Sequence, residues 1–258
     1  MTPTVAWISL TPVKGLALDH VEEIELLESG LRGDRRFYLV DEGSRLVNNK
    51  GRKRSALQLV RGHFDEATNE LTVRLADGGE IVGPAEPGDE LQTSFHSHPK
   101  TARRVPGPWD GALSELVDEP VRLVTAEHGA PDRGRSGAAT LLGVASLETL
   151  AGELGVAGID GRRFRMNFGI DGLEPHVEDS WIGVRLRIGE AVVVPQGHVG
   201  RCTITTQNPD SGVSDLDTLK ALAAYRGDLD ATEPLPFGVH AAIAAAGRVR
   251  VGDPVQPV

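Results

Sequence analysis

A single cysteine, Cys202, is the residue of this chain best suited to nucleophilic or soft-metal chemistry. It lies in the run VGRCTITTQNPDSG, directly after Arg201. A neighbouring guanidinium favours the thiolate, which is the form that attacks electrophiles and binds soft metals. Free cysteines are also among the residues most often buried in protein cores. Two interpretations are therefore open for Cys202, a reactive or metal-binding thiol and a packing residue.

Two histidines, His96 and His98, resemble part of a zinc site, because they would share one face of a strand. No third or fourth ligand lies at a recognisable spacing, and the cysteine is far away in the sequence. The sequence also lacks a Gly-x-Ser-x-Gly nucleophile elbow, a Walker loop and a Gly-x-Gly-x-x-Gly fingerprint. It therefore gives little support to a zinc protein, a serine hydrolase of that type, or a nucleotide-driven or directly NAD-dependent enzyme.

The charge balance limits the classes of partner. The 258 residues include 27 Lys and Arg against 37 Asp and Glu, a formal net charge of −10. Such a protein is a poor match for nucleic acids and anionic membranes, whose phosphates require a positive surface. Two basic stretches stand out, RLVNNKGRKR over residues 45–54 and RRFR over 162–165. The first is either a docking surface for an acidic redox partner or a solvated basic face.

The composition is that of a globular protein. Hydrophobic residues make up 40% of the chain and charged residues 25%, and no apolar run approaches the roughly 18 residues of a membrane-spanning helix. The N-terminal MTPTVAWISLTPVKG has no basic region leading into a long apolar stretch. A single cysteine cannot form an internal disulfide, so the thiol can persist in a reducing compartment. We expect a cytoplasmic protein without an export signal or a membrane anchor.

Short apolar or alternating runs dominate the first ninety residues and predict strands joined by turns. These runs are VAWISL, FYLVD, ALQLV and ELTVRLADGGEIV. In the last run Asp77-Gly78 supplies the left-handed conformations of a hairpin turn. The polar, proline-bearing segment over residues 93–108 predicts a domain junction or a long surface loop.

Helical patterns appear in the second half of the chain. One helix is expected to be capped by Asp110, and another to be capped by Ser146 and to end at Gly155. A third follows a capping box of Ser214 and Asp217. Further strands are expected in FRMNFGI, VRLRIGEAVVV, the alanine-rich residues 241–246, CTITT and RVRV.

Many short motifs, in a consistent order and spacing, resemble the MOSC family, which is named after the C-terminal domain of molybdenum cofactor sulfurase and includes the mitochondrial amidoxime-reducing component and its bacterial relatives. The resemblance covers nearly the whole chain except residues from about 81 to 135. Its N-terminal motifs are TPVKG (11–15), GL (30–31), DRRFYLVD (34–41) and LV (46–47). Its C-terminal motifs are FRMN (164–167), IDG (170–172), EDSW (178–181), LRIG (186–189), GRC (200–202), TT (205–206), NPDSG (208–212), LK (219–220), YR (225–226), FG (237–238) and VGDP (251–254).

The resemblance implies a mainly β fold with a few helices (α+β), built as a MOSC N-terminal β-barrel-like domain over residues 1–105 and a MOSC barrel over 106–258. It implies a molybdenum–molybdopterin cofactor between the two, with the Cys202 thiolate bonded to molybdenum and basic side chains on the pterin phosphate. The positions that match the family's cofactor contacts are Lys14, Gly15, Arg35, Arg165, Asn167, Asp179, Arg201, Thr205 and Thr206. Structural alternatives are open for several of these: the arginines could pair with nearby carboxylates, the aspartate could cap a turn, and the threonines could pack in a strand.

Three functions follow from the resemblance. The leading one is an oxidoreductase that reduces small N-hydroxylated (N-oxygenated) compounds, without nucleic acid or membrane partners. Its electrons would come from a separate flavoprotein or ferredoxin-type reductase, since the sequence has no cysteine cluster for an iron–sulfur centre. The second is sulfur transfer, with Cys202 as a persulfide carrier linked to a pyridoxal-phosphate sulfurase. The third is a non-catalytic carrier of the cofactor.

Overall fold

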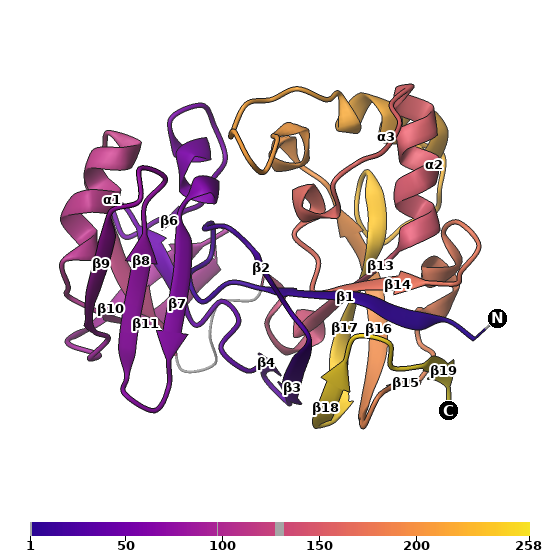
Figure 1. Ribbon diagram of the computed structural model, residues 1–258, viewed down its shortest axis with the longest axis horizontal. Helices are drawn as coiled ribbons and strands as arrows, with labels where there is room; N and C mark the ends of the chain where they lie inside the picture. The colour runs from indigo at the N-terminus through magenta and orange to yellow at the C-terminus, as the bar shows by residue number, and fades with distance from the viewer. Residues whose placement is uncertain (1, 97, 127–131) are drawn as a thin grey trace.

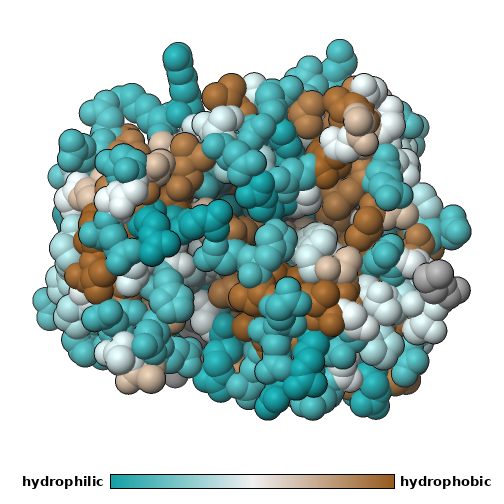
Figure 2. Space-filling model, viewed as in Figure 1, coloured by the Kyte–Doolittle hydropathy of each residue, from teal (hydrophilic) through white to brown (hydrophobic). Residues whose placement is uncertain are grey.

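The computed structural model describes residues 2–96, 98–126 and 132–258. The fold is mainly β with a few helices, as the sequence predicts. Figure 1 shows two lobes, with α1 and strands β6 to β11 in the left one and α2, α3 and most of the later strands in the right one. Hydrophilic side chains predominate on the face seen in Figure 2, and the hydrophobic ones form separate patches. None of the described helices is both long enough and apolar enough to span a membrane.

The first lobe combines a five-stranded sheet, of order β10-β11-β12-β5-β6, with the three-stranded sheet β7-β8-β9. Its helix α1 (Trp109–Val117) packs against the 3-10 helix η1 (Arg54–Leu59). Trp109 and Leu113 on α1 are fully buried in a core with Phe37. The strands of this lobe are β5 (Phe37–Val40), β6 (Leu46–Val47), β7 (Arg61–Asp65), β8 (Glu70–Arg74), β9 (Glu80–Pro84), β10 (Glu90–Phe95), β11 (His98–Arg104) and β12 (Arg122–Thr125).

The second lobe is built on an eight-stranded sheet, of order β19-β15-β16-β17-β13-β14-β1-β2, and the three-stranded sheet β18-β3-β4. Helices α2 (Val144–Leu154) and α3 (Thr218–Arg226) pack against each other. Its strands are β1 (Thr4–Leu10), β2 (Asp19–Val21), β3 (Glu23–Leu27), β4 (Gly30–Leu31), β13 (Ala139–Gly143), β14 (Phe168–Asp171), β15 (Leu186–Ile188), β16 (Ala191–Gly200), β17 (Pro236–Ala245), β18 (Gly247–Arg250) and β19 (Val255–Pro257). Its 3-10 helices are η2 (Gly134–Gly137), η3 (Gly161–Phe164), η4 (Val177–Trp181) and η5 (Thr203–Thr206).

The chain crosses between the lobes more than once. Strand β1 pairs antiparallel with β14, and β3 pairs with β18, so Val5, Ile8 and Leu26 lie in the second lobe's core. Between β1 and β2, however, Val13 and Leu16 are buried in the first lobe's core. The segments around residues 11–18 and 32–36 therefore lie where the lobes meet. Because α1 and β12 belong to the first lobe, each lobe draws on separate stretches of sequence, and the predicted domain division after residue 105 stays a prediction.

Most of the strands expected from the sequence are confirmed, including the alanine-rich segment, which forms the end of β17. The hairpin β8-β9 is also confirmed, with Gly78 at a φ of +90° in its turn. All three helices form, and Gly155 ends α2 in a left-handed conformation, as predicted.

Two of the expected strands are wrong. All of the run ALQLV except its last residue belongs to η1, and TITT forms η5. In η5 the hydroxyls of Thr205 and Thr206 donate to backbone carbonyls three residues earlier, at 3.0 and 2.8 Å. Such local bonds compete with a strand ladder, so a run of β-branched residues folds into a turn instead. The run ALQLV is also too short for its periodicity to distinguish strand from helix.

The long surface loop predicted over residues 93–108 is wrong as well, whereas the domain junction predicted there stays a prediction. Strands β10 and β11 form an antiparallel hairpin there, although Ser97 lies outside the described residues. Only one face of this hairpin is covered. Thr93 and Ala102 are buried, and the Tyr38 and Thr93 hydroxyls lie 2.7 Å apart. The segment reads as polar because the other face meets solvent.

The predicted helix caps are wrong, although their helices form. Helix α1 begins at Trp109, and the carboxylate of Asp110 instead accepts from the Leu123 amide at 2.9 Å. The Ser146 hydroxyl lies within α2 and donates to Glu178 at 2.8 Å. Asp217 is the N-cap of α3 but makes no side-chain cap bond.

Candidate functional site

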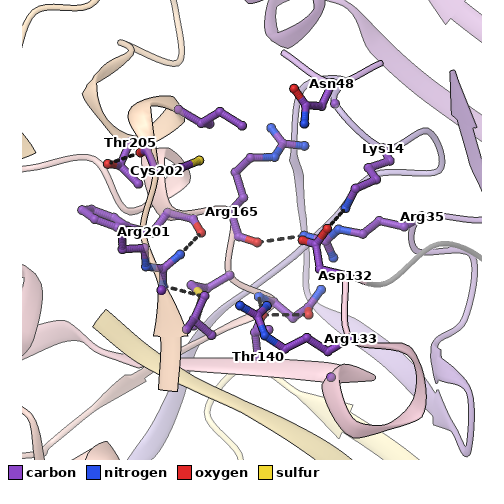
Figure 3. A pocket seen from close by; sticks show the side chains of 18 of the residues that line it. Lys14, Arg35, Asn48, Asp132, Arg133, Thr140, Arg165, Arg201, Cys202 and Thr205 are labelled. Atoms are coloured by element: carbon purple, nitrogen blue, oxygen red, sulfur yellow. Dashed lines mark hydrogen bonds and ion pairs between the residues drawn. The ribbon is translucent and has the colours of Figure 1, made fainter. Parts of the chain in front are cut away.

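A cavity of about 400 Å³ lies between the two lobes. Its wall contains most of the predicted site residues, which come from distant parts of the sequence, as the close view in Figure 3 illustrates. They are Lys14, Gly15, Arg35, Arg165, Asn167, Arg201, Cys202 and Thr205. The fold thus brings together side chains from the lobe crossings near residues 14 and 35 with others from the second lobe.

Cys202 lies just after the end of β16 and directly before η5, of which it is the N-cap residue. Its carbonyl accepts hydrogen bonds from the amide and the hydroxyl of Thr205, at 3.1 and 3.0 Å, and these bonds fix the turn. The Thr205 hydroxyl in turn lies 2.7 Å from that of Thr218 on α3. The cysteine is exposed, and Figure 3 shows its sulfur among the residues that line the cavity. The packing interpretation of Cys202 is therefore wrong.

Lys14 is a buried cation in the first lobe's wall. Its side chain is 9% exposed, and its Nζ lies 2.6 Å from Asp132 and over the Phe95 ring. Burial lowers the pKa of the ammonium, Asp132 opposes this, and Arg35 and Arg165 lower the pKa further. The backbone of the next residue, Gly15, lines the cavity with a φ of +96°, which side chains rarely permit.

Arg35 and Arg165 are held side by side. An Arg35 Nη donates to the Arg165 carbonyl at 2.8 Å, and the other Nη pairs with Asp34. Arg165 donates to the Leu16 carbonyl at 2.7 Å. Burial, followed by the charge of Arg35, lowers the pKa of Arg165 to about 10. The structural-salt-bridge alternative thus applies to Arg35, whereas no carboxylate of the described residues forms a salt bridge with Arg165.

Asn167 and Arg201 line the cavity, but most of their hydrogen bonds go to other groups of the protein. The side-chain Nδ2 of Asn167 donates to the Ser9 carbonyl at 3.2 Å and to the Asp34 carboxylate at 3.0 Å. Its Oδ1 accepts from the Thr140 hydroxyl at 2.9 Å. Asn167 therefore orients Asp34, and through it Arg35.

The guanidinium of Arg201 binds backbone rather than a carboxylate. It donates to the Phe237 and Phe164 carbonyls, both at 2.9 Å, and contacts the Met166 sulfur at 3.0 Å. Burial, followed by the charge of Arg133, lowers its pKa to about 9. Arg201 thus acts mainly as a brace that joins the Cys202 turn to neighbouring segments.

Two predicted residues do not line the cavity. Asp179 pairs with Arg226 at 2.7 Å and lies 3.6 Å from a ring nitrogen of His198, inside the second lobe. The Thr206 hydroxyl bonds Thr203 and Ser214. The structure gives these residues local roles in the second lobe.

The sequence reasoning missed several lining residues, among them Asp132, Arg133 and Glu233. Arg133 pairs with Glu233 at 2.5 Å, and the same carboxylate accepts from the Gly200 amide at 2.8 Å. No sequence signal marks these residues, because two of them lie in the stretch that matches the family poorly. Asn48 also lines the cavity, and its place just after the LV motif is the only hint the sequence offers.

The strand placement expected for the two histidines is wrong. His96 lies in the turn before β11, with a φ of 49°, and only His98 lies on a strand. Both line the cavity, and His96 bonds Asp132 at 2.8 Å. Among the described residues no group of three or more potential ligands could hold a metal ion in the manner of a zinc site.

The basic stretch over residues 45–54 is largely neutralised. Arg45 pairs with Asp41 at 2.9 Å, Lys53 with Asp118 at 2.5 Å, and Arg54 with Glu119. These contacts favour the solvated-face interpretation over a docking surface for an acidic partner.

The electrostatics of the cavity favour an anion. Six cationic side chains line it against three carboxylates, an excess that is unusual in a protein of net charge −10. Buried cations that repel one another are stabilised by an anionic ligand. An accessible thiol in the same cavity adds a soft-metal ligand. These groups fit a cofactor that carries both a phosphate and a thiophilic metal. The cations are Lys14, Arg35, Arg133, Arg163, Arg165 and Arg201.

Fold and site together define a two-lobed, mainly β protein with a basic cleft and an accessible cysteine. Residues 126–256 match the MOSC domain and residues 2–107 match the MOSC N-terminal beta barrel domain. The chain belongs to the MOSC domain family, as the sequence motifs indicate.

Named relatives support the same family. The mouse protein called mitochondrial amidoxime-reducing component 1 is 29% identical over 98% of this chain and 81% of its own length. The human mitochondrial amidoxime reducing component 2 is 38% identical over a shorter region, 36% of this chain and 29% of that protein. A rice molybdenum cofactor sulfurase is 40% identical over 26% of this chain and 8% of its length. The name of the rice relative associates the family with the molybdenum cofactor.

Proposed function

We propose that this protein binds the molybdenum cofactor in the cleft and reduces small N-oxygenated compounds. The observation that carries the proposal is the meeting of an accessible thiol, Cys202, with a cluster of buried and half-buried cations in one cavity. The thiolate would hold the metal, while Lys14, Arg35 and Arg165 would hold the phosphate, since guanidinium and ammonium groups are strong phosphate donors. Arg201 and Asn167 would hold the Cys202 turn and the Arg35 side chain in place.

The reaction is a two-electron reduction. An N-hydroxylated compound takes up two electrons and two protons, its N–O bond breaks, and the products are the N–H compound and water. When bound, the cofactor supplies the two-electron redox chemistry. The chain's own part is to orient the cofactor and to leave one side of the cavity open to a small substrate.

Electrons are proposed to come from a separate flavoprotein or ferredoxin-type reductase. The sequence offers one cysteine, which cannot bind an iron–sulfur cluster. The net charge of −10 agrees with a protein that needs neither nucleic acid nor membrane surface. The reaction is assigned to the cytoplasm, where a free thiol remains reduced.

The first test is the molybdenum content of the wild type, Cys202→Ala and Arg165→Gln, each produced in a host that makes the cofactor. Arg187→Gln is the matched control, because Arg187 is exposed on β15, away from the cavity lining. We expect near-stoichiometric metal in the wild type and the control, and a sharp fall in the other two. Absence of metal in every protein would count against the proposal. Turnover by the pure protein with NADH alone would contradict the separate reductase.

Sulfur transfer is the second candidate, favoured by the exposure of Cys202 and by the similarity to a sulfurase. Here Cys202 would receive sulfur as a persulfide from an external pyridoxal-phosphate desulfurase. Mass spectrometry after incubation with a cysteine desulfurase and cysteine would show one added sulfur on Cys202 if this candidate is correct. A third candidate, a carrier without turnover, predicts tight cofactor binding but no reduction of N-hydroxylated compounds with any competent electron donor.

A further inference from the structure

The carboxylate of Asp132 lines the cavity and pairs with Lys14, one of the six cations. Its Oδ1 is 2.6 Å from Lys14 Nζ and 2.8 Å from His96 Nε2. Figure 3 shows the end of the Lys14 side chain joined to Asp132 by a dashed line. The Lys14 side chain is 9% exposed, whereas that of Asp132 is 45% exposed. The more exposed carboxylate thus covers the buried ammonium and takes a position that a ligand oxygen would otherwise use.

The residue after Asp132 holds this arrangement in place. Arg133 forms a two-pronged ion pair with Glu233, at 2.6 and 2.5 Å. Glu233 lies just before β17 in the second lobe, whereas Lys14 and His96 belong to the first lobe's side of the cavity. Two adjacent residues of opposite charge are therefore anchored to opposite walls.

Asp132 is also the main charge that offsets the cations around Lys14. Partial desolvation by the surrounding protein atoms raises the pKa of Asp132, but Lys14, His96 and then Arg35 more than reverse this, so the pKa lies well below its ordinary range. Asp132 is consequently ionised at neutral pH. A phosphate dianion that approaches Lys14 meets a negative charge already hydrogen-bonded there, and like charges at such distances repel strongly.

We propose that Asp132 is an internal competitor for the anion site, and that a phosphate monoester reaches Lys14 only by displacing the Asp132 carboxylate. A weakly charged or monovalent anion gains too little from the remaining cations to displace it. A ligand with a dianionic phosphate gains enough, and a second attachment elsewhere in the cavity adds to its affinity. Asp132 therefore sets the affinity and selectivity of the site. This inference rests on the anion-binding part of the proposed function and is independent of its redox part.

The test is to measure, by calorimetry at neutral pH, how tightly the cofactor-free protein binds inorganic phosphate. We expect Asp132→Asn to bind phosphate about tenfold more tightly than the wild type, because one like charge has been removed beside the ligand. Asp118→Asn is the matched control, since Asp118 is 78% exposed and pairs with Lys53 outside the cavity. It removes the same net charge and should change the affinity by less than about twofold. Unchanged or weaker binding by Asp132→Asn would overturn the inference.

A double-mutant cycle with Lys14→Gln identifies the site of competition. Without the Lys14 ammonium, Asp132→Asn should improve phosphate binding by much less than in the wild-type background, because the two residues act on the same atom of the ligand. An equal improvement in both backgrounds would overturn displacement at Lys14. If phosphate binds but Asp132→Asn has no effect, the inference fails while the proposed function stands. If no variant binds phosphate, both the inference and the anion-binding part of the proposed function fail.

Discussion

The guanidinium of Arg35 donates a 2.8 Å hydrogen bond to the backbone carbonyl of Arg165, 130 residues further along the chain. Both residues have left-handed backbone conformations, with φ values of 46° and 54°. Such conformations in non-glycine residues cost on the order of 1 kcal/mol each and occur where the surroundings enforce them. Strain and like charge thus coincide at the point where the lobes meet, as is typical of binding sites.

Glycine should relieve this strain at position 165. We expect Arg165→Gly to be about 1 kcal/mol more stable than Arg165→Ala, because both lose the bond to Leu16 but only glycine adopts a positive φ freely. Urea denaturation of the two variants measures the difference. Both should lose phosphate binding to a similar extent. An alanine variant as stable as the glycine variant would show that the backbone at 165 carries no strain.

Arg201 and Arg165 should differ in what they stabilise. Arg201→Gln leaves the buried Phe164 and Phe237 carbonyls without their donor, so we expect a loss of about 2 to 3 kcal/mol in unfolding free energy. Arg165→Gln should lose less stability but more phosphate affinity, since only one carbonyl depends on Arg165. Denaturation and phosphate titration of both variants decide this. The opposite ranking in either measurement would refute the assignment of Arg201 as a brace.

Asn167 should not tolerate a carboxylate. In Asn167→Asp the new side chain faces Asp34, which now accepts a 3.0 Å bond from the amide, so two buried carboxylates meet. We expect a loss of about 3 kcal/mol at pH 7. The repulsion raises the folded-state pKa of the pair, so the loss should shrink as the pH falls towards about 4.

The same change at Asn208 is the control for Asn167. Asn208 donates to Asp215 at 2.9 Å in an exposed setting, so Asn208→Asp should lose less than about 1 kcal/mol. Equal losses at the two positions, or a loss at Asn167 that does not depend on pH, would argue against a buried carboxylate pair.

His176 should make the protein sensitive to acid. Burial, followed by the charge of Arg226, lowers the pKa of this imidazole from 6.5 to about 4. The unfolded chain is therefore protonated first, and stability that is present above pH 6.5 is lost as the pH falls towards 4. The ring packs 5.7 Å from Tyr225 and 6.0 Å from Phe237, so His176→Phe keeps a ring there without the titration. The free energy of unfolding of this variant, relative to that of the wild type, should increase as the pH falls from about 7.5 to about 4.5. A stability difference that stays constant over this range would exclude His176 as the source.

The strands could be predicted where burial alternates or is continuous, as in FYLVD and VRLRIGEAVVV, because hydrophobic period is a local property. Prediction was wrong where side-chain bonds within the segment competed with the sheet, as at Thr205 and Thr206. It was also wrong at residues 93–108, where a hairpin with one solvent-facing side resembles a loop.

The candidate site was partly predictable. Its motif residues Lys14, Arg35, Arg165 and Cys202 do line one cavity. Asp132 and Arg133 were missed, because their contacts are with Lys14 and Glu233, which are far away in the sequence, and no local sequence pattern predicts such contacts. Asp179 and Thr206 matched motifs, yet their side chains bond within the second lobe.

By itself the sequence determined the mainly β fold, the family and the set of motif residues that includes one cysteine and several cations, because periodicity, residue type and motif order are properties of the chain. Only the tertiary structure decided what each charge does. It assigned Arg201 to backbone carbonyls, Arg165 to the cavity wall and Asp132 to the Lys14 ammonium. The reason is physical: the effect of a charged side chain depends on which groups the backbone path places within a few ångströms of it, and that path is set by the packing of both lobes.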